Sequence, residues 1–396
     1  MGTDYFKELP NNWEIKKFGD VAKITCGVAA TPEYVDASIG IPFFSARNVQ
    51  NGRLDLNYFQ YISVELHKKL TKNTKPERGD ILLTRVGAGI GEAAVVNIDF
   101  EFSVYVSLTL IKCSKKIESE FIKLLLNTNY YRYLATRDQF AGGGVQNLNV
   151  QMVKDYPIPV PPLLEQKKIA QILSTWDQAI SATEKLLENS QQQKKALMQQ
   201  LLTGKKRLLD ENGVKFSDEW QRIELGLLLD YQQPTPYLVE STAYSDSYET
   251  PVLTAGKTFI LGYTNESSGI YQDQLPVIIF DDFTTDSKYV NFPFKAKSSA
   301  MKILTAKKGV SIKFVFEAMQ MLQFTVGGHQ RHWISIFSNL VIPLPNIKEQ
   351  QQIAEVLSLA DQEIETLQKK LDCLKQEKKA LMQQLLTGKK RVKVAA

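Results

Sequence analysis

Hydrophobic residues recur at alternating spacings of four and three along two long stretches of the chain. In the second stretch the pattern runs from Ile353 to Leu385, and nine of its ten positions are apolar. The first stretch follows the same pattern from Ile169 to Leu201. This spacing is typical of coiled-coil helices. We therefore predict two long helices, each with one apolar seam along its length.

The seam residues define the faces on which these helices are expected to pack. In the first helix they are Ile169, Leu173, Trp176, Ile180, Leu187, Leu197 and Leu201. In the second helix they are Ile353, Leu357, Ile364, Leu367, Leu371, Leu374, Leu381 and Leu385. Lys194 and Lys378 interrupt the two seams at the same place. A polar seam residue lowers stability but can fix register and orientation.

The two helical stretches are near-copies of each other. IPVPPLLEQKKIAQILSTWDQAI, from Ile158, recurs as IPLPNIKEQQQIAEVLSLADQEI, from Ile342. At the same offset, KKALMQQLLTGKKR occurs at residues 194–207 and, unchanged, at 378–391. Neither helix can hide its seam alone, so we expect the two to form an intramolecular antiparallel coiled coil with pseudo-twofold symmetry. The alternative is that each helix pairs with a second copy of the chain in a homodimer.

Local signals mark where each helix begins and ends. Prolines before both helices favour an extended lead-in. Asn346 with Glu349 forms a capping-box variant at the start of the second helix. Gly204 and Gly388 follow the last apolar residues and suit the left-handed conformation that ends a helix.

The segments before the two helices are related to each other but have diverged. Pro42 matches Pro251 near their start and Gly143 matches Gly327 near their end, and the offset shortens by steps in between, as expected if one ancestral domain gained or lost loops. Short apolar runs, one short helix and polar loops predict a compact mixed α+β module in each segment. The predicted domains are a first module (1–157), a first helix (158–204), a linker (205–219), a second module (220–341), a second helix (342–388) and a basic tail (389–396).

Loops of both modules hold residues suited to reading DNA. Arginine suits guanine edges, and asparagine or glutamine suits adenine edges, in the major groove. In the first module the candidates are Arg47, Asn48, Arg85, Gln139, Gln146, Asn147 and Asn149. In the second module they are Gln233, Thr235, Tyr237, Lys257, Tyr263, Lys297, Ser298, Gln330, Arg331 and Trp333. Each residue alone is compatible with an ordinary solvated loop, so the prediction depends on their density at matching places.

Signals that resemble catalytic motifs are incomplete. Residues 254–258 end like a phosphate-binding loop, but Pro251 stands where that motif needs glycine. Asp281, Asp282 and Asp286 suggest a metal-dependent nuclease, yet no further acidic partner at suitable spacing joins them. We predict no catalytic residue and no metal site on this chain.

Composition narrows the class of protein. There are 48 Lys and Arg residues against 43 Asp and Glu, a net charge of +5 that permits a polyanionic partner without demanding one. The 3 cysteines are odd in number and far apart, which favours reduced thiols in a cytosolic protein. The sequence lacks a signal-peptide core and an apolar run long enough to cross a bilayer, so we expect a cytoplasmic protein.

The duplicated pattern resembles the specificity subunit of type I restriction–modification enzymes. The resemblance covers nearly the whole chain and depends on the two helical repeats with their ALMQQLLTGKKR ends. It also includes RGDILLTRVGAGIGEAAVV in the first module, and PVLTAGKTFILGYTNE with PVIIFDDFTT in the second. Few other families place two variable modules on two conserved helices.

The resemblance implies that the modules are target recognition domains, each reading one half of a bipartite site in double-stranded DNA. The helices would set the spacer between the halves and dock two modification subunits, which are S-adenosylmethionine-dependent adenine methyltransferases. Restriction subunits, which use ATP and Mg²⁺ for translocation and cleavage, would join this core. No cofactor is expected on this chain itself.

Three alternatives remain open at this point. The chain is also compatible with a related system in which cleavage and methylation share one polypeptide. A stand-alone nuclease would use Asp281, Asp282 and Asp286. A protein-interaction scaffold would use the coiled coil alone.

Overall fold

The computed structural model describes residues 6, 9–27, 32–72, 75–137, 147–254, 258–322 and 332–394. It divides into two compact units. Unit 1 combines residues 1–182 with 371–396, and unit 2 comprises residues 183–370. Both long helices cross this division, so each unit contains one module and half of each helix. The domain limits predicted from the sequence follow the internal repeat, and they therefore differ from the boundaries of these two units.

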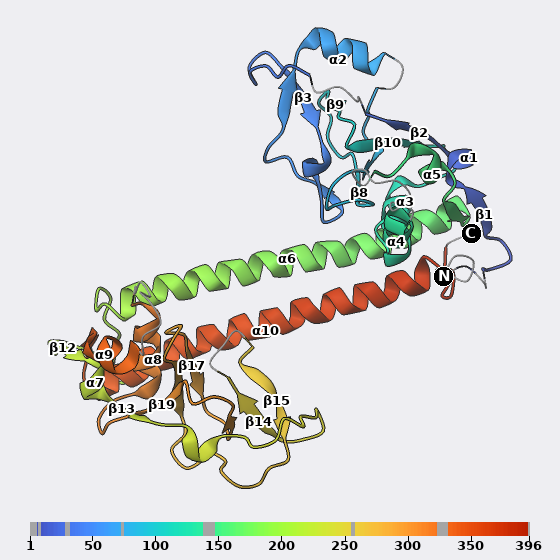
Figure 1. Ribbon diagram of the computed structural model, residues 1–396. Coiled ribbons are helices and arrows are strands. Elements are labelled where there is room, and N and C mark those ends of the chain that lie inside the picture. Colours follow the sequence, from blue (N-terminus) through green and yellow to red (C-terminus); the bar gives the residue numbers. More distant parts are fainter. Residues whose placement is uncertain are drawn as a thin grey trace. The chain divides into compact units, whose positions relative to one another are not determined.

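Unit 1 contains the first module, drawn mainly in blue and teal in Figure 1. Its strands are β1 (Glu14–Lys17), β2 (Ala22–Cys26), β3 (Ile41–Phe44), β4 (Val49–Gln50), β5 (Arg53–Leu54), β6 (Gln60–Ile62), β7 (Ile81–Thr84), β8 (Ala93–Val95), β9 (Ser103–Val104), β10 (Leu108–Cys113) and β11 (Pro157–Val160). Its helices are α1 (Phe18–Val21), η2 (Ala46–Asn48), α2 (Val64–Thr71), α3 (Ser119–Leu126), α4 (Asn129–Arg137), α5 (Val150–Lys154) and the first part of α6 (Leu163–Leu201).

A four-stranded sheet in the order β2-β10-β7-β8 forms the centre of the first module. Its strands pair antiparallel, with Ile111 opposite both Ile24 and Ile81. Every residue of β7 is buried, which explains why this strand reads as a continuous apolar run. A second sheet, β6-β3-β9, and two short ladders, β4-β5 and β1-β11, complete the module.

Unit 2 contains the second module. Its strands are β12 (Gln221–Glu224), β13 (Leu229–Gln232), β14 (Thr250–Leu253), β15 (Ile260–Thr264), β16 (Val277–Asp281), β17 (Ser287–Val290), β18 (Lys295–Ala296), β19 (Met301–Ala306) and β20 (Val341–Leu344). Its helices are α7 (Leu225–Leu228), η3 (Thr235–Tyr237), α8 (Ile312–Gln320), α9 (His332–Ser335), η4 (Phe337–Asn339) and the first part of α10 (Ile347–Leu385).

The second module repeats the plan of the first. Its four-stranded sheet β13-β19-β16-β17 corresponds to β2-β10-β7-β8, and its three-stranded sheet β15-β14-β18 corresponds to β6-β3-β9. In both, the last strand before the long helix pairs with the first strand of the module. The mixed α/β character predicted for both modules is confirmed.

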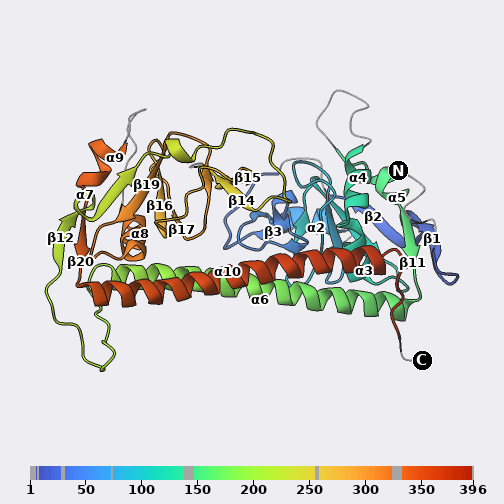
Figure 2. The same cartoon turned by 90° about the horizontal axis from the view of Figure 1, so that it is seen from below.

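One amphipathic helix in each module packs on the long helices. In unit 1, Phe121 and Leu125 of α3 share a core with Ile169 and Leu173 of α6 and with Leu385 at the end of α10. In unit 2, Phe314 and Val315 of α8 share a core with Leu201, Ile353 and Leu357. Figure 2 shows α3 lying against the long helices. Each module and its helix pair therefore fold around one hydrophobic core.

The two long helices each contain 39 residues. The residues predicted to form the two seams are buried or half-buried, and none of them is exposed. The Asn346 side chain accepts a hydrogen bond from the Glu349 N–H at 3.0 Å, which is one half of the predicted capping box. The Glu349 carboxylate accepts from Arg207 and Trp220 instead. Gly204 and Gly388 follow the helices with φ of 70° and 74°. Strands β11 and β20 form the extended proline-containing lead-ins.

Within each unit the two helices run antiparallel. In unit 1 the start of α6 lies beside the end of α10, because Glu165 pairs with Arg391. In unit 2 the end of α6 lies beside the start of α10, because Arg207 pairs with Glu349. The predicted fold class, two mixed α/β domains with two long helices packed on each other within one chain, is confirmed. Along the part of the chain that the structure describes, no helix is both long and apolar enough to span a membrane.

The seam should contribute most of the stability of the helix pair. Leu357 is completely buried, whereas Leu359 on the same helix is 59% exposed. We expect Leu357→Ala to lower the free energy of unfolding by about 2–5 kcal/mol, because it leaves a cavity in the core. The matched variant Leu359→Ala should change it by about 0.5 kcal/mol or less. Urea unfolding followed by circular dichroism measures both, and equal effects would contradict the seam assignment.

Candidate nucleic-acid interface

Three loops of the first module meet at the turn between β9 and β10. The Ser107 hydroxyl accepts a hydrogen bond from the Ala46 N–H at 2.9 Å. The Ser107 carbonyl accepts one from the Arg85 N–H at 3.0 Å. Nearby, the Gly27 N–H donates to the Leu108 carbonyl at 3.1 Å. The loops that follow β2, β3 and β7 are thus held together at one edge of the module.

The second module joins the equivalent loops in the same way. The Lys297 N–H donates to the Leu253 carbonyl at 2.9 Å, at the end of β14. The Asp282 N–H donates to the Ala300 carbonyl at 3.2 Å, just after β16. Strands β14 and β16 correspond to β3 and β7, so two of the three loops are joined at the same edge in both modules.

Arg47 and Asn48, adjacent in η2, have different surroundings. Arg47 is exposed at this edge. The Asn48 side chain is buried, and its amide donates to the Asp55 and Tyr58 carbonyls at 3.0 and 2.7 Å. Its amide oxygen accepts from the Ser45 N–H at 3.0 Å. Asn48 therefore organises the loop, and its position argues against a base contact.

Arg85 and Asn147 are hydrogen-bonded to each other. Arg85 is 8% exposed, and its guanidinium donates to the Asn147 amide oxygen at 2.9 and 3.2 Å. It also donates to the Leu148 carbonyl at 3.0 Å. Asn149 remains exposed, while its side chain caps α5 by accepting from the Gln151 N–H at 2.8 Å. These contacts fix the chain at residue 147, where the described part resumes after residue 137.

In the second module, Gln233 and Thr235 are exposed between β13 and the end of η3. Tyr237 is half-buried: its ring packs edge-on against Tyr271 at 4.8 Å, and its hydroxyl accepts from the Gln232 amide at 3.2 Å. Gln233 and Thr235 are the accessible members of this group.

The remaining accessible candidates of the second module lie on its three-stranded sheet and the loop after β18. Tyr263 lines a hollow of about 540 Å³ together with Pro251 and Phe292. The Lys297 ammonium lies 5.9 Å from the centre of the Tyr244 ring, a cation–π distance. The Ser298 hydroxyl accepts from the Ala300 N–H at 3.1 Å and so shapes its own turn.

Trp333 lies in the core. It is 2% exposed, and its ring packs against Phe280 at 5.2 Å and against Phe337 at 6.5 Å. Its backbone N–H donates to the Asp282 carboxylate at 2.9 Å. This burial argues against a DNA contact by the indole. The predicted contacts Gln139, Gln146, Lys257, Gln330 and Arg331 lie outside the described residues.

The three aspartates of the nuclease alternative do not converge on a metal site. Asp282 is 2% exposed and pairs with the buried ammonium of Lys302 at 3.4 Å. Asp281 accepts from the Phe283 N–H at 2.9 Å, within its own turn. Over the described residues, no group of three His, Cys, Asp or Glu side chains is placed to hold a metal ion.

A buried glutamate fastens each module to the helix pair. In unit 1, Glu165 accepts two hydrogen bonds from Arg391, at 2.6 and 2.8 Å, and one from the Trp13 indole at 3.1 Å. In unit 2, Glu349 accepts the same set from Arg207, at 2.6 and 2.7 Å, and from Trp220 at 3.1 Å. Charge-assisted bidentate pairs of this kind fix geometry as well as charge.

The neighbouring glutamines repeat this pattern. Gln166 accepts from the Glu118 N–H at 2.8 Å and donates to the Pro161 carbonyl at 2.8 Å. Gln350 accepts from the Ser311 N–H at 2.9 Å and donates to the Pro345 carbonyl at 2.8 Å. Both glutamines are buried at the start of α3 or α8. These Glu-Gln pairs were not among the predicted site residues, although they recur at equivalent positions of the repeat.

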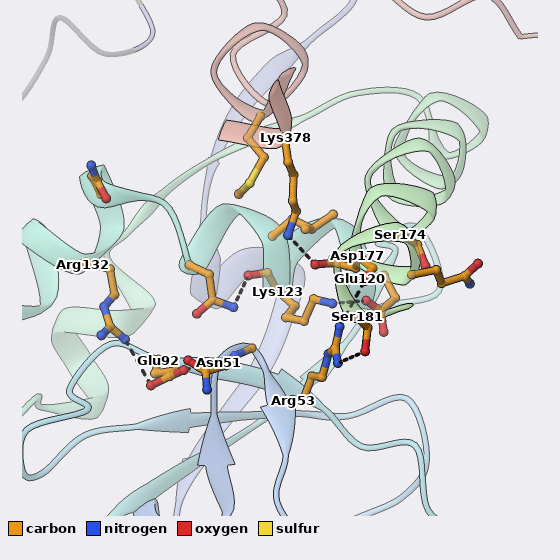
Figure 3. Close-up of a pocket in the computed structure, with 16 residues that line it drawn as sticks. Asn51, Arg53, Glu92, Glu120, Lys123, Arg132, Ser174, Asp177, Ser181 and Lys378 are labelled. Carbon is orange, nitrogen blue, oxygen red and sulfur yellow. Dashed lines mark hydrogen bonds and ion pairs between the residues drawn. The ribbon is translucent and has the colours of Figure 1, made fainter. Parts of the chain in front are cut away.

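The lysines that interrupt the seams each have a carboxylate partner. Lys378 pairs with Asp177 at 2.6 Å in unit 1, and Figure 3 shows the ammonium directed at this aspartate. Lys194 pairs with Asp361 at 2.6 Å in unit 2. Asp177 and Asp361 themselves occupy equivalent positions of the repeat. The same lysine–aspartate contact therefore sets the register of the helices in both units.

Unit 2 adds two charges to this contact. Glu317 of α8 is completely buried and lies 2.7 Å from Lys313 and 3.1 Å from Lys194. Lys313 also reaches Asp361 at 3.0 Å. Burial raises the pKa of the Asp361 carboxyl, but the hydrogen bonds from Lys194 and Lys313 outweigh burial and place that pKa below its ordinary value. This four-charge cluster connects the second module to both helices.

Comparison with known proteins identifies relatives with the same organisation. The family model of the type I restriction modification DNA specificity domain matches residues 10–190 and 217–376. The chain is 54% identical over 132 residues to the EcoR124I/EcoR124II specificity subunit of Escherichia coli, a match that covers 32% of each chain. It is 26% identical to the putative MjaX specificity subunit of Methanocaldococcus jannaschii, over 98% of this chain and 95% of that relative.

The fold is similar to a solved structure of the same class. The crystal structure of the type I restriction–modification S subunit from M. genitalium matches with a TM-score of 0.66 at 16% identity. The match covers 96% of this chain and 97% of that one.

The four-charge cluster should make stability depend on acid pH. Because the pKa of Asp361 is lower in the folded state, its contribution is complete above about pH 4 and is lost as pH falls through the folded pKa. We expect Asp361→Asn to lower the free energy of unfolding by about 1–2 kcal/mol at pH 7, less than for a fully buried pair. The difference from wild type should shrink towards pH 3.

Urea unfolding at pH 7 and pH 3 measures this dependence. Glu365→Gln is the matched control, because Glu365 makes a surface pair with Lys369 and is 65% exposed. It should change the free energy of unfolding by about 0.5 kcal/mol or less at either pH. A destabilisation by Asp361→Asn that is the same at both pH values would contradict the ionic role of Asp361.

Proposed function

The chain belongs to the type I restriction–modification DNA specificity family, and we propose that each of its modules reads one half of a bipartite site in double-stranded DNA. It is the DNA specificity subunit of such a system, with two target recognition domains and no catalytic role of its own. The proposal depends on one observation: two modules with the same fold and the same fastening to the helices differ in the side chains at their equivalent loop edges.

We place the base contacts at these two loop edges. The exposed described candidates are Arg47, Asn147, Asn149, Gln233 and Thr235, and Tyr263, Lys297 and Ser298 are half-buried. Arginine, glutamine and asparagine side chains supply paired donors and acceptors for base edges, whereas lysine and serine suit the phosphates. Gln139, Gln146, Lys257, Gln330 and Arg331 remain predicted contacts.

The long helices act in this proposal as the frame that sets the spacer. Each module shares a hydrophobic core and a bidentate Arg–Glu pair with both helices, so it cannot turn independently of them. The exposed faces of the helices are available for docking two modification subunits. Restriction subunits complete the complex.

The chemistry belongs to the partner subunits in this proposal. Methyltransferase subunits supply S-adenosylmethionine and take the target adenine out of the duplex. Restriction subunits supply ATP- and Mg²⁺-dependent translocation and cleavage. The chain selects the DNA sequence and positions the partner subunits on it. It does so in the cytoplasm, where these partners meet DNA. A fused system, with methylation and cleavage on one partner polypeptide, uses the same reading surface.

The first test maps each loop edge to one half of the site. Genome-wide reading of methylated adenines should show a bipartite motif that depends on this chain. We expect Arg47→Ala to weaken discrimination at one base pair of one half-site, by about 1–3 kcal/mol, because a bidentate base contact is lost. Gln233→Ala should do the same in the other half-site only.

Each of these variants is the control for the other. Both side chains are exposed, so neither change should alter the melting temperature. Loss of discrimination in the same half-site by both variants, or uniform loss over all sequences, would contradict the assignment of one module to each half. Methylation that does not require the chain would contradict the function itself.

The second test concerns the spacer. Inserting one heptad into both helices keeps the seam in phase and lengthens the frame by about 10 Å at about 1.5 Å per residue. The tolerated spacer should then increase by about three base pairs, with both half-site sequences unchanged. A seven-residue insertion in the linker at 205–219 is the control and should leave the motif unaltered. An unchanged spacer in the helix variant would show that the helices do not measure it.

A further inference from the structure

A groove in unit 1 carries positive charge on one wall. Along this groove, of about 430 Å³, the described lining includes four lysines and no carboxylate. Three of them, Lys375, Lys378 and Lys379, come from α10, and Lys389 follows the end of that helix. Lys375, Lys379 and Lys389 are exposed, whereas Lys378 is half-buried and pairs with Asp177. The groove thus has a basic wall open to solvent.

The opposite wall is neutral and includes the start of a helix. It consists of residues 127–130, with Asn129 and Tyr130 forming the first turn of α4. The positive end of the helix dipole favours an anion in this place. Thr387, Gln383 and Met382 complete the lining with a hydroxyl, an amide and an apolar surface. The groove adjoins a larger polar hollow of about 600 Å³, shown in Figure 3, with which it shares Asn127, Asn129, Lys378 and Met382.

Unit 2 shows what occupies the corresponding place there. When α3 and α8 are matched by their N-caps, Glu118 and Ser311, Glu317 stands opposite Leu124. Glu317 is a buried anion that lies 3.1 Å from Lys194, the counterpart of Lys378. Leu124 is apolar and buried. Asn127, three residues later, lines the groove and is neutral. Its amide oxygen accepts from the Ala93 N–H at 3.1 Å, and its amide N–H donates to the Ala93 carbonyl at 2.8 Å. The second module therefore supplies its own anion to the lysine, whereas the first has a leucine at that place and an open groove.

We propose that this groove, named here the lysine groove, binds a phosphate group. Lysine ammonium groups on flexible stems are common phosphate ligands. The volume exceeds that of one phosphate, and Met382 with Tyr130 offers apolar surface to the group that bears it. The phosphate comes either from a free nucleotide or from the DNA backbone. The site lies on the helix frame rather than on the loop edges, so binding there is independent of base sequence and goes beyond the proposed function.

The repeat provides a matched control for testing this site. Lys379 and Lys389 recur one repeat earlier as Lys195 and Lys205, in identical local sequence and equally exposed. The double variant Lys379→Gln with Lys389→Gln removes two charges from the groove. The double variant Lys195→Gln with Lys205→Gln removes the same two charges from the other repeat. Net charge and local sequence are therefore equal in the two proteins.

The measurement uses the full chain at low ionic strength with two probes. Titration calorimetry with pyrophosphate measures a free phosphate, and a salt series with a short duplex that lacks the methylated motif measures the DNA backbone. We expect the groove variant to weaken binding by about tenfold or more, and the control variant by less than about twofold. If the backbone is the ligand, only duplex binding falls, and its salt dependence weakens by about one unit of slope per lysine.

Equal effects of the two double variants on both probes would overturn the proposal. The lysines would then act only through the net charge of the protein and not through a binding site. No effect of either variant on either probe would overturn it as well. Gln383→Glu provides a second variant that keeps every lysine, and Gln383 is an exposed residue of the groove lining. It should also weaken binding, because it adds a carboxylate to the groove. The methylated motif should be unchanged in all these variants, so failure here is distinguishable from failure of the proposed function.

Discussion

The antiparallel direction of the two long helices depends on one repeated ion pair. A glutamate near the start of each helix accepts two hydrogen bonds from an arginine that follows the end of the other helix. In a parallel arrangement these groups would lie a helix length apart. The same carboxylate also accepts from a tryptophan at the start of its module, Trp13 or Trp220. One buried charge thus ties the module, the first helix and the second helix together in each unit, and the seam packing and the loop positions follow from it.

The features that depend on periodicity were predictable from the sequence, and those that depend on one side chain were not. The seams, the glycine caps and the mixed α/β modules follow from patterns spread over many residues, which tertiary contacts rarely override. Trp333, Asn48 and Arg85 were predicted at the DNA surface because their chemistry suits it, but the same chemistry suits a core ring, a loop-organising amide and an internal guanidinium. Glu165 was missed, and Glu349 was assigned only to a helix cap, because a single glutamate on a helix ordinarily faces water.

The repeat is not symmetric in its electrostatics. Both units keep the lysine–aspartate contact in the seam, but only the second module contributes a buried carboxylate, Glu317, to it. The cost of burying that carboxylate is offset by the two ammonium groups that flank it, which makes the second junction dependent on all four charges. The first junction has Leu124 at the equivalent helix position and a polar hollow beside Lys378 instead. Near-identical helices therefore meet two chemically different modules, and the modules account for the difference.

The division between a constant frame and variable readers has a physical basis at the loop edges. The contacts that join these loops are largely backbone to backbone, such as Arg85 N–H to the Ser107 carbonyl and Lys297 N–H to the Leu253 carbonyl. Exposed side chains beside them can change without breaking such bonds, so the reading surface can diverge at little cost to folding. The fastening contacts are made by side chains, Glu165 and Arg391 among them, and a change in one leaves a buried charge unpaired. Backbone hydrogen bonds thus leave the side chains at the loop edges able to change. Side-chain bonds constrain the residues that fasten each module to the helices.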